Sequence, residues 1–247
     1  MSASRAVEIA VQDLAGIRTA LTEGADRIEL CMGLDVGGLT PSIGLIESAV
    51  DAARGTGAEG FVHALIRPRG GDFVYNEHDL AVATRDIHRA VSAGVDGVVI
   101  GALTMDGGID LSATEDLVSA AQDVDVTFHR AFDVVKDQEK ALEQLVDIGV
   151  LRVLTSGGAP TCAEGVQALA HLVETSDDMI EIMAGGSVSV DDIPALIHAG
   201  VDAVHLSARR SARGGASGPG GGEATYDQTD GETVRAAISA ALSADPN

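Results

Sequence analysis

The stretch Gly24-Ala25-Asp26-Arg27-Ile28 decides the fold, because close copies of it recur along the chain. The copies are Gly94-Val95-Asp96-Gly97-Val98, Gly149-Val150-Leu151-Arg152-Val153 and Gly200-Val201-Asp202-Ala203-Val204, with a looser one at Gly57-Ala58-Glu59-Gly60-Phe61. Each follows a helical pattern and precedes a short apolar run. A glycine that ends a helix adopts the left-handed conformation and turns the chain into the next strand. Repeated helix, glycine and strand indicate parallel β/α units.

Eight short apolar runs are predicted as strands, with amphipathic helical stretches between them. They are residues 7–11, 27–31, 61–67, 97–101, 125–129, 152–156, 181–184 and 203–207. Eight such units predict an α/β protein, a single (β/α)8 TIM barrel over residues 1–247, with an open doubly wound sheet as the alternative. Residues 209–225, RRSARGGASGPGGGEAT, are expected to form a flexible Gly/Ser-rich loop, which either serves the site or is an insertion without a role.

The charge of the chain excludes several partners. There are 38 acidic and 16 basic residues, a net charge of −22, which disfavours nucleic acid and anionic lipid. No long apolar run or secretory signal is recognisable, so neither a membrane span nor export is expected. The two cysteines favour a reducing cytoplasm over a disulfide framework. The acidic composition, with few lysines, predicts adaptation to high salt; an ordinary acidic cytosolic protein is the alternative.

Several predicted strands carry polar side chains where a packed barrel would hold apolar ones. They are Glu8, Glu29 with Cys31, His63 with Arg67, Thr127 with His129, Thr155, and His205 with Ser207. Alternate strand residues point inward and unpaired buried charge is unfavourable, so these groups predict a polar pocket. Glu29 or His129 can serve as the acid–base, and Asp133 can orient a neighbour. Structural ion pairs and a satisfied core histidine are the alternative.

The loop Arg67-Pro68-Arg69-Gly70-Gly71-Asp72-Phe73 suggests an anionic ligand, because two guanidinium groups suit carboxylate or phosphate. Asp72 and Glu29 can instead neutralise these arginines. Glycine-rich turns after the sixth and seventh strands, and the end of the eighth, favour an oxyanion at the same end of the barrel. The candidate ligand-binding residues are Glu8, His63, Arg67, Arg69, Asp72, Thr155, Ser156, Gly185, Gly186, His205 and Ser207.

Copper(I) prefers thiolate and thioether ligands, so Cys31 is the candidate metal ligand, assisted by Met32 or a pocket histidine. The alternative is that Cys31 is a small buried hydrophobic residue. Cys162 follows the sixth strand, on the opposite side of the barrel, and is not expected to share an ion with Cys31.

The chain resembles the CutC family from about Val7 to Ser211. The resemblance rests on several motifs: GADRIELC at 24–31, GGLTPS at 37–42, IRPRGGDF at 66–73, GALT at 101–104, TFHRAFD at 127–133 and LTSG at 154–157. Two positions depart from the family pattern, Ser187 in place of a third glycine and Leu206 in place of a cysteine. The resemblance implies a (β/α)8 barrel, a cytoplasmic location and a homodimer or larger assembly. It also implies a role in copper homeostasis, with Cu(I) as a ligand.

Three functions remain open at this point. The first is CutC-like copper homeostasis with Cu(I) binding. The second is a barrel enzyme that acts on a small anionic metabolite, phosphorylated or resembling a sugar acid, in a pocket at the C-terminal ends of the strands. The third is a non-catalytic oligomeric binding protein, which the chain encodes if the pocket is fully ion-paired.

Overall fold

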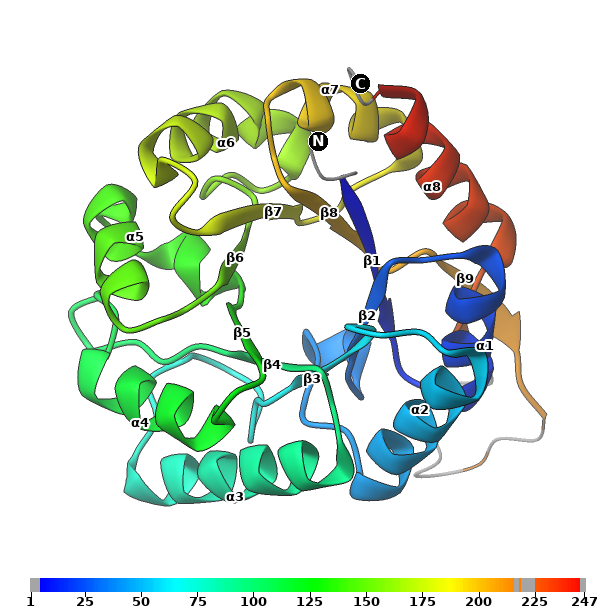
Figure 1. The fold of residues 1–247 in the computed structure, drawn as a ribbon, viewed down its shortest axis with the longest axis horizontal. Helices are drawn as coiled ribbons and strands as arrows, with labels where there is room; N and C mark the ends of the chain where they lie inside the picture. Colours follow the sequence, from blue (N-terminus) through cyan, green and yellow to red (C-terminus); the bar gives the residue numbers. More distant parts are fainter. Residues whose placement is uncertain (1–4, 216–217, 219–224, 245–247) are drawn as a thin grey trace.

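The barrel is formed by eight parallel strands that close on themselves in the order β1 to β8 (Figure 1). The computed structural model describes residues 5–215, 218 and 225–244. The strands are β1 Ala6–Val11, β2 Arg27–Leu30, β3 Val62–Leu65, β4 Gly97–Ile100, β5 Asp125–Phe128, β6 Arg152–Thr155, β7 Glu181–Gly185 and β8 Ala203–Leu206. This confirms the predicted TIM barrel, and the closure between β1 and β8 excludes the open sheet.

Helices form the outer ring. They are α1 Leu14–Glu23, α2 Ile43–Thr56, α3 Glu77–Ala93, α4 Leu111–Ala121, α5 Gln138–Asp147, α6 Cys162–Ser176, α7 Ile193–His198 and α8 Gly231–Ala244, with short 3-10 turns η1 Leu34–Val36, η2 Arg130–Val134 and η3 Val190–Asp192. The recurrent glycine ends helices as predicted: Gly24 and Gly94 have φ of 86° and 94°, and their N–H groups donate to carbonyls of the preceding turn.

Apolar side chains fill the space between the strands and the helices. Ile87 and Ala90 of α3 are fully buried, as are Phe61 and Phe128 beside the strands. Because the charged residues of each helix lie on the opposite face, burial of this apolar stripe fixes the helices against the barrel. The barrel interior is left to the alternate strand residues, and many of these are polar.

The lower part of the barrel interior is held by ion pairs. Glu8 Oε2 accepts from Arg27 Nε at 2.6 Å. On the other side, Arg152 donates to Glu181 Oε2 at 2.5 Å and to Thr127 Oγ1 at 3.0 Å. The buried Glu8, Arg27 and Arg152 therefore all find partners at the strand starts and need no ligand.

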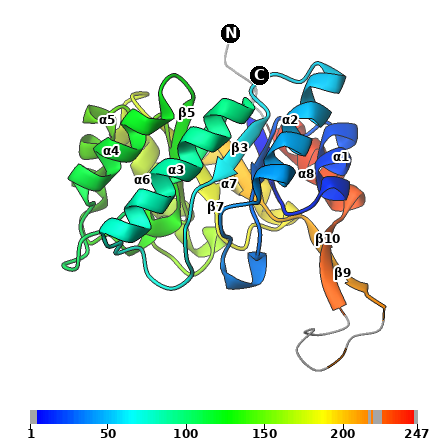
Figure 2. The ribbon, with the colours of Figure 1, turned by 90° about the horizontal axis from the view of Figure 1, so that it is seen from below.

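A two-stranded hairpin follows β8. Its strands, β9 Arg209–Arg213 and β10 Thr225–Thr229, pair antiparallel and project from the end of the barrel opposite the N-terminus (Figure 2). The sequence pattern, read as a flexible loop over 209–225, did not predict these strands. Residues 216–217 and 219–224 of that loop lie outside the described residues. None of the described helices is long and apolar enough to cross a membrane.

Candidate active site

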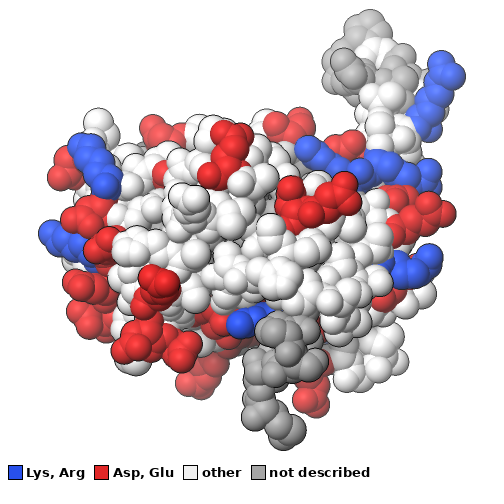
Figure 3. Space-filling model, turned by 90° about the horizontal axis from the view of Figure 1, so that it is seen from above, with Lys and Arg blue, Asp and Glu red and all other residues white. Residues whose placement is uncertain are grey.

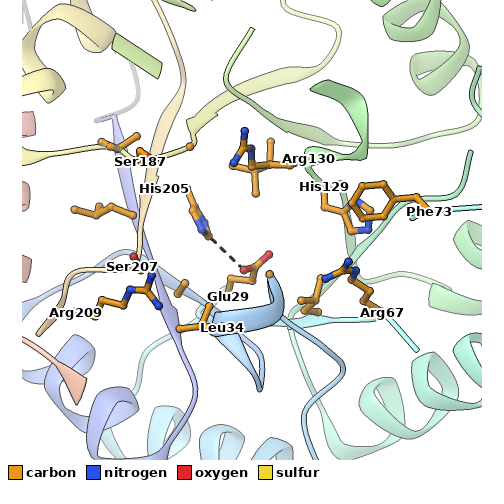
Figure 4. Close-up of a pocket in the computed structure, with 17 residues that line it drawn as sticks. Glu29, Leu34, Arg67, Phe73, His129, Arg130, Ser187, His205, Ser207 and Arg209 are labelled. Atoms are coloured by element: carbon orange, nitrogen blue, oxygen red, sulfur yellow. Dashed lines mark ion pairs between the residues drawn. The ribbon is translucent and has the colours of Figure 1, made fainter. Parts of the chain in front are cut away.

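A cavity of about 230 Å³ opens at the C-terminal end of the barrel (Figure 4). The residues predicted from the sequence that line it are Glu29, Arg67, His129, Gly186, His205 and Ser207. The other predicted site residues are not among its lining: Glu8, Cys31, His63, Arg69, Asp72, Asp133, Thr155, Ser156 and Gly185. The structure therefore brings only part of the predicted site residues together at the cavity. The others are held elsewhere by contacts with neighbouring residues.

Glu29 points from β2 toward the centre of the cavity (Figure 4). The residue is only 7% exposed, and its Oε2 lies 3.9 Å from His205 Nε2. Burial raises the pKa of Glu29 to about 7, although the His205 cation pulls it down; the Glu8 carboxylate adds to the rise. This carboxyl group can therefore gain or lose a proton near neutral pH, which suits a general acid or base.

Glu8 and His205 support Glu29 from below. His205 Nδ1 lies 2.7 Å from Glu8 Oε1. Burial alone would raise the pKa of Glu8, but the neighbouring Arg27 and His205 hold it well below its usual range. The hydrogen bond to Glu8 and the charge of Glu29 likewise raise the pKa of His205 against burial. His205 thus lies between the two carboxyl groups, 2.7 Å from Glu8 and 3.9 Å from Glu29.

His129 forms another wall of the cavity, at the start of η2. Its Nδ1 accepts a hydrogen bond from the Ala131 N–H at 3.2 Å, while Nε2 is buried without a hydrogen-bond partner among the described residues. The ring packs on Phe73 with centroids 4.9 Å apart. Burial, with the positive charge of Arg67, lowers the pKa of His129 to about 3. The imidazole is therefore neutral, and its proton lies on Nε2.

Arg67 lines the cavity, but its guanidinium is used to hold loops. Nη1 donates to the carbonyls of Val36 and Gly38 at 3.0 and 2.9 Å, and Nη2 donates to the Gly71 carbonyl at 2.9 Å. Nε is buried and unpartnered among the described residues. No ion pair joins Arg67 to Glu29 in the described part of the chain, so the structure does not show the neutralising contact that the sequence left open.

Arg69 and Asp72 lie beyond the kink at Pro68 and close their own loop. Arg69 Nη2 lies 3.0 Å from Asp72 Oδ1, and Arg69 Nε lies 3.0 Å from Asp79 Oδ2 on α3. The expected clamp of two arginines on one anion is therefore not assembled. Strand alternation directs Arg67 inward, whereas Pro68 ends that alternation and leaves Arg69 to the loop.

Asp133 organises the loop after β5 rather than reaching the cavity. It accepts from Arg130 Nε at 2.7 Å, Thr155 Oγ1 at 2.6 Å and the Ser156 N–H at 2.8 Å. Ser156 Oγ in turn donates to the Ala159 carbonyl at 2.6 Å. The Asp133 carboxylate thus orients Arg130, which lines the cavity.

Two lining arginines were missed by sequence reasoning. Arg130 is placed by Asp133 three residues later in η2, a spacing that could have indicated the pair. Arg209 reaches the cavity from β9, where it pairs with Asp227 at 2.8 Å; it belongs to the stretch read as a loop. Both side chains are about two-fifths exposed, at 43% and 41%. They form a cationic rim above the buried groups (Figure 4).

The turn after β7 allows Arg130 to approach. Gly186 has φ of 135°, and a Cβ there would lie 3.1 Å from Arg130 Cζ. Gly185 packs beneath, where a Cβ would meet Leu154 at 2.3 Å. Ser187, which follows, lines the cavity with φ of 54°, a left-handed conformation that is unfavourable for a residue with a side chain.

The described residues hold no group of three or more His, Cys, Asp or Glu side chains placed to bind a metal ion. Cys31 is fully buried beside Leu65, and its Sγ contacts the Val11 carbonyl at 3.5 Å. Burial, with the charge of Glu29, raises the pKa of the Cys31 thiol well above its usual range. Burial thus favours the protonated Cys31 thiol over the thiolate that binds metals.

His63 is buried lower in the barrel, with Nε2 3.3 Å from the Gly60 carbonyl.

Comparison with known proteins gives one consistent family. The sequence model of the CutC family matches residues 5–210. A CutC family protein of Glaesserella parasuis is 44% identical over 204 residues, 82% of each chain, and one of Agrobacterium fabrum is 45% identical over 208 residues, 81% of this chain and 80% of that one. A crystal structure from Streptococcus agalactiae, assigned provisionally to the copper homeostasis protein CutC, has a TM-score of 0.78 and 37% identity, covering 82% of this chain and 98% of that one.

Proposed function

The chain belongs to the CutC family, and we propose that it shares the part in copper homeostasis that is assigned to the Streptococcus agalactiae relative. At the molecular level, we propose that the cavity at the barrel mouth binds a small anionic metabolite and acts on it by acid–base chemistry. These are two levels of one proposal, the cellular role and the working site. The site can be tested without knowing the role.

The observation that carries the molecular proposal is the state of Glu29. A structural carboxylate in a barrel interior is paired tightly, as Glu8 is with Arg27 at 2.6 Å. Glu29 instead faces a cavity, has its nearest cation 3.9 Å away, and has its pKa raised to about 7 by burial. Carboxyl groups perturbed in this way and placed in a cleft are typical of acid–base catalysts.

The anionic character of the ligand is supported by the cationic rim. Acidic side chains are scattered over the visible face among uncharged ones (Figure 3), and the chain has 38 acidic residues against 16 basic ones. Against that background, Arg130 and Arg209 line the same cavity from different sides, and Arg67 lines it as well (Figure 4). A planar guanidinium suits a carboxylate or phosphate, and a partly exposed one can change partners when a ligand arrives.

A thermal-shift screen followed by titration calorimetry tests this proposal. Inorganic phosphate, phosphorylated sugars and sugar acids should raise the melting temperature of the wild type. Arg130→Gln should weaken binding about tenfold or more, because one charge-assisted contact is lost. Arg85→Gln removes the same charge from the exposed face of α3 and should bind normally. If no anion binds, or if Arg130→Gln binds as well as the wild type, the proposed site is wrong.

Direct Cu(I) binding is the second candidate, favoured by the description of the Streptococcus agalactiae relative. Cys31 is its principal ligand, and the neighbouring Met32, 43% exposed, is the nearest thioether in sequence. Cu(I) titration against a competing chelator should compare wild type with Cys31→Ala and with Cys162→Ala, a matched buried cysteine. A loss confined to Cys31→Ala supports this candidate. Unchanged affinity removes Cys31, and no binding at all removes direct copper binding.

We further propose a cytoplasmic location and a homodimer or larger assembly, as the family resemblance implies, in a salt-adapted cell. We propose a single domain in which the start of the hairpin after β8 borders the site, since Arg209 lines the cavity. Light scattering after size-exclusion chromatography, at low and multimolar KCl, tests the assembly; a monomer under both conditions contradicts it.

A further inference from the structure

The unpartnered Nε2–H of His129 points to the chemistry of the site. The Ala131 N–H occupies Nδ1, so in the neutral ring the proton must lie on Nε2. That N–H is buried and has no acceptor among the described residues, and the imidazole that carries it belongs to a residue that lines the cavity. Buried N–H groups without an acceptor are rare, and one on a side chain beside a cavity indicates a ligand that supplies the acceptor.

The ring that carries this donor is held in place. A Cβ on Gly101 would lie 2.3 Å from His129 Cε1, so the glycine makes room for the imidazole. Phe73 packs on the ring, with centroids 4.9 Å apart. A rigid, neutral donor in a site shielded from water can stabilise negative charge that develops on a ligand oxygen, because it needs little reorganisation.

Glu29 projects into the same cavity from β2, and His129 lines it from the end of β5, three strands away around the barrel (Figure 4). The titratable and charged groups around Glu29 are His205 on β8, Glu8 on β1, Cys31 at the end of β2, Arg67 after β3, Arg130 in η2 and Arg209 on β9. Of these, His205 also lines the cavity and lies 3.9 Å from the carboxyl group, beyond hydrogen-bond distance. The cavity thus combines a carboxylate able to accept a proton with a neutral donor for an oxygen atom.

Two other chemistries fit the lining less well. The chain has only two lysines, Lys136 and Lys140, and neither lines the cavity, so no Schiff base can form there. Ser187 and Ser207 line it, but no hydrogen bond joins either to a histidine in the described part of the chain. A nucleophilic serine with its base is therefore not assembled.

We propose, resting on the proposed function, that the cavity catalyses proton abstraction from the carbon next to the carbonyl of a small hydroxy-aldehyde or hydroxy-ketone that carries a phosphate or carboxylate. Glu29 takes the proton as the C–H bond breaks, and that electron pair forms the C=C bond of an enediolate. The carbonyl π electrons move to oxygen, where His129 Nε2–H stabilises the charge. Return of the proton to the original carbon regenerates the compound. If the hydroxyl proton of the enediolate first moves to the neighbouring oxyanion, return of the proton to the former carbonyl carbon isomerises the compound, without an oxidant or cofactor.

Deuterium exchange tests this step directly. Dihydroxyacetone phosphate and hydroxypyruvate serve as the phosphorylated and carboxylated probes, with dihydroxyacetone as the uncharged comparison. In D2O, wild type should introduce deuterium next to the carbonyl of a charged probe, at a rate that rises with pH through an apparent pKa near that of Glu29. The two charged probes show which oxyanion the rim accepts.

Variants separate the roles of the two residues. Glu29→Gln should slow exchange about 100-fold or more, which also rules out a contaminating isomerase. His129→Phe keeps a flat ring without the donor and should lower kcat about 100-fold with little change in KM. His129→Gln restores a side-chain N–H and should recover part of the rate, and Arg85→Gln should behave as wild type. Circular dichroism confirms that each variant is folded.

Calorimetry with the same probes distinguishes a failure of anion binding at the cavity from a failure of the enolisation step. If a charged probe binds and Arg130→Gln weakens it, but wild type exchanges no faster than buffer, the proposed site stands and the enolisation step is wrong. If exchange persists in Glu29→Gln, the assignment of the base is wrong. If neither charged probe binds, both proposals fail.

Discussion

Replacing Glu29 by glutamine should stabilise the protein, and only at neutral and alkaline pH. The pKa of this carboxyl group is raised from 4.5 to about 7 by burial. Between these values the folded state binds a proton that the unfolded state has released. The free energy of unfolding therefore falls as pH rises from 4.5 through 7, and the contribution present below pH 4.5 is lost above 7.

The size of the effect follows from the same two values. At 1.36 kcal/mol for each pKa unit, the rise from 4.5 to about 7 corresponds to about 3 kcal/mol. Glutamine cannot ionise and avoids this penalty. The gain of Glu29→Gln over wild type should thus grow from near zero at pH 4.5 to about 3 kcal/mol at pH 8.

Urea unfolding at constant KCl, between pH 4.5 and 8, measures this gain. Glu47→Gln is the matched control, because it removes an exposed carboxylate on α2 and so accounts for the general relief of charge in a chain of net −22. The reasoning is refuted if the gain does not depend on pH, or if Glu47→Gln shows the same gain.

Three further predictions concern other parts of the molecule. Arg67→Met should lower the free energy of unfolding by about 3 kcal/mol, because three carbonyls lose a charged donor; Glu29→Gln should change the stability of this variant by the same amount as it changes the wild type, and a clearly larger gain in the variant would show that the two side chains are coupled. Ser187→Gly should raise the melting temperature by about 2–4 °C, because φ of 54° suits glycine; an unchanged or lower value contradicts the strain. Multimolar KCl should raise the wild-type melting temperature by several degrees, since it screens the acidic surface; equal or greater stability in low salt counts against salt adaptation.

The fold could be predicted because its signals are local. Gly24 and Gly94 end helices by their own conformation, whatever the rest of the chain does. A short apolar run after each glycine is then sufficient to indicate a parallel strand. The hairpin of β9 and β10 escaped notice because its strands, RRSAR and TYDQT, are polar and exposed, so no apolar alternation marks them.

The site could be predicted only in part. The alternation of side chains along a strand shows which of them point into the barrel, but not at which level along the barrel axis they lie. Glu8 and Glu29 both point into the barrel, yet Glu8 pairs with Arg27 at its lower level and Glu29 reaches the cavity. That difference depends on the stagger between strands, which no single strand encodes. Loop residues are harder still. Arg69 and Asp133 contact partners that are distant in sequence, Asp79 and Thr155, at 3.0 and 2.6 Å.

Two buried histidines, His63 and His129, each have one ring nitrogen without a hydrogen-bond partner among the described residues. The difference between them indicates where a ligand can bind in the barrel. His63 has Nε2 near the Gly60 carbonyl, so its proton lies there and the unpartnered Nδ1 is an acceptor. His129 has the opposite arrangement, since the Ala131 N–H occupies its acceptor and the unpartnered atom is a donor. Burial of an acceptor with spare lone pairs is tolerated more often than burial of an N–H. His63 is not among the residues that line the cavity at the barrel mouth, whereas His129 is. The polar interior is therefore structural at the strand starts and left incomplete at the strand ends, where a ligand can complete it.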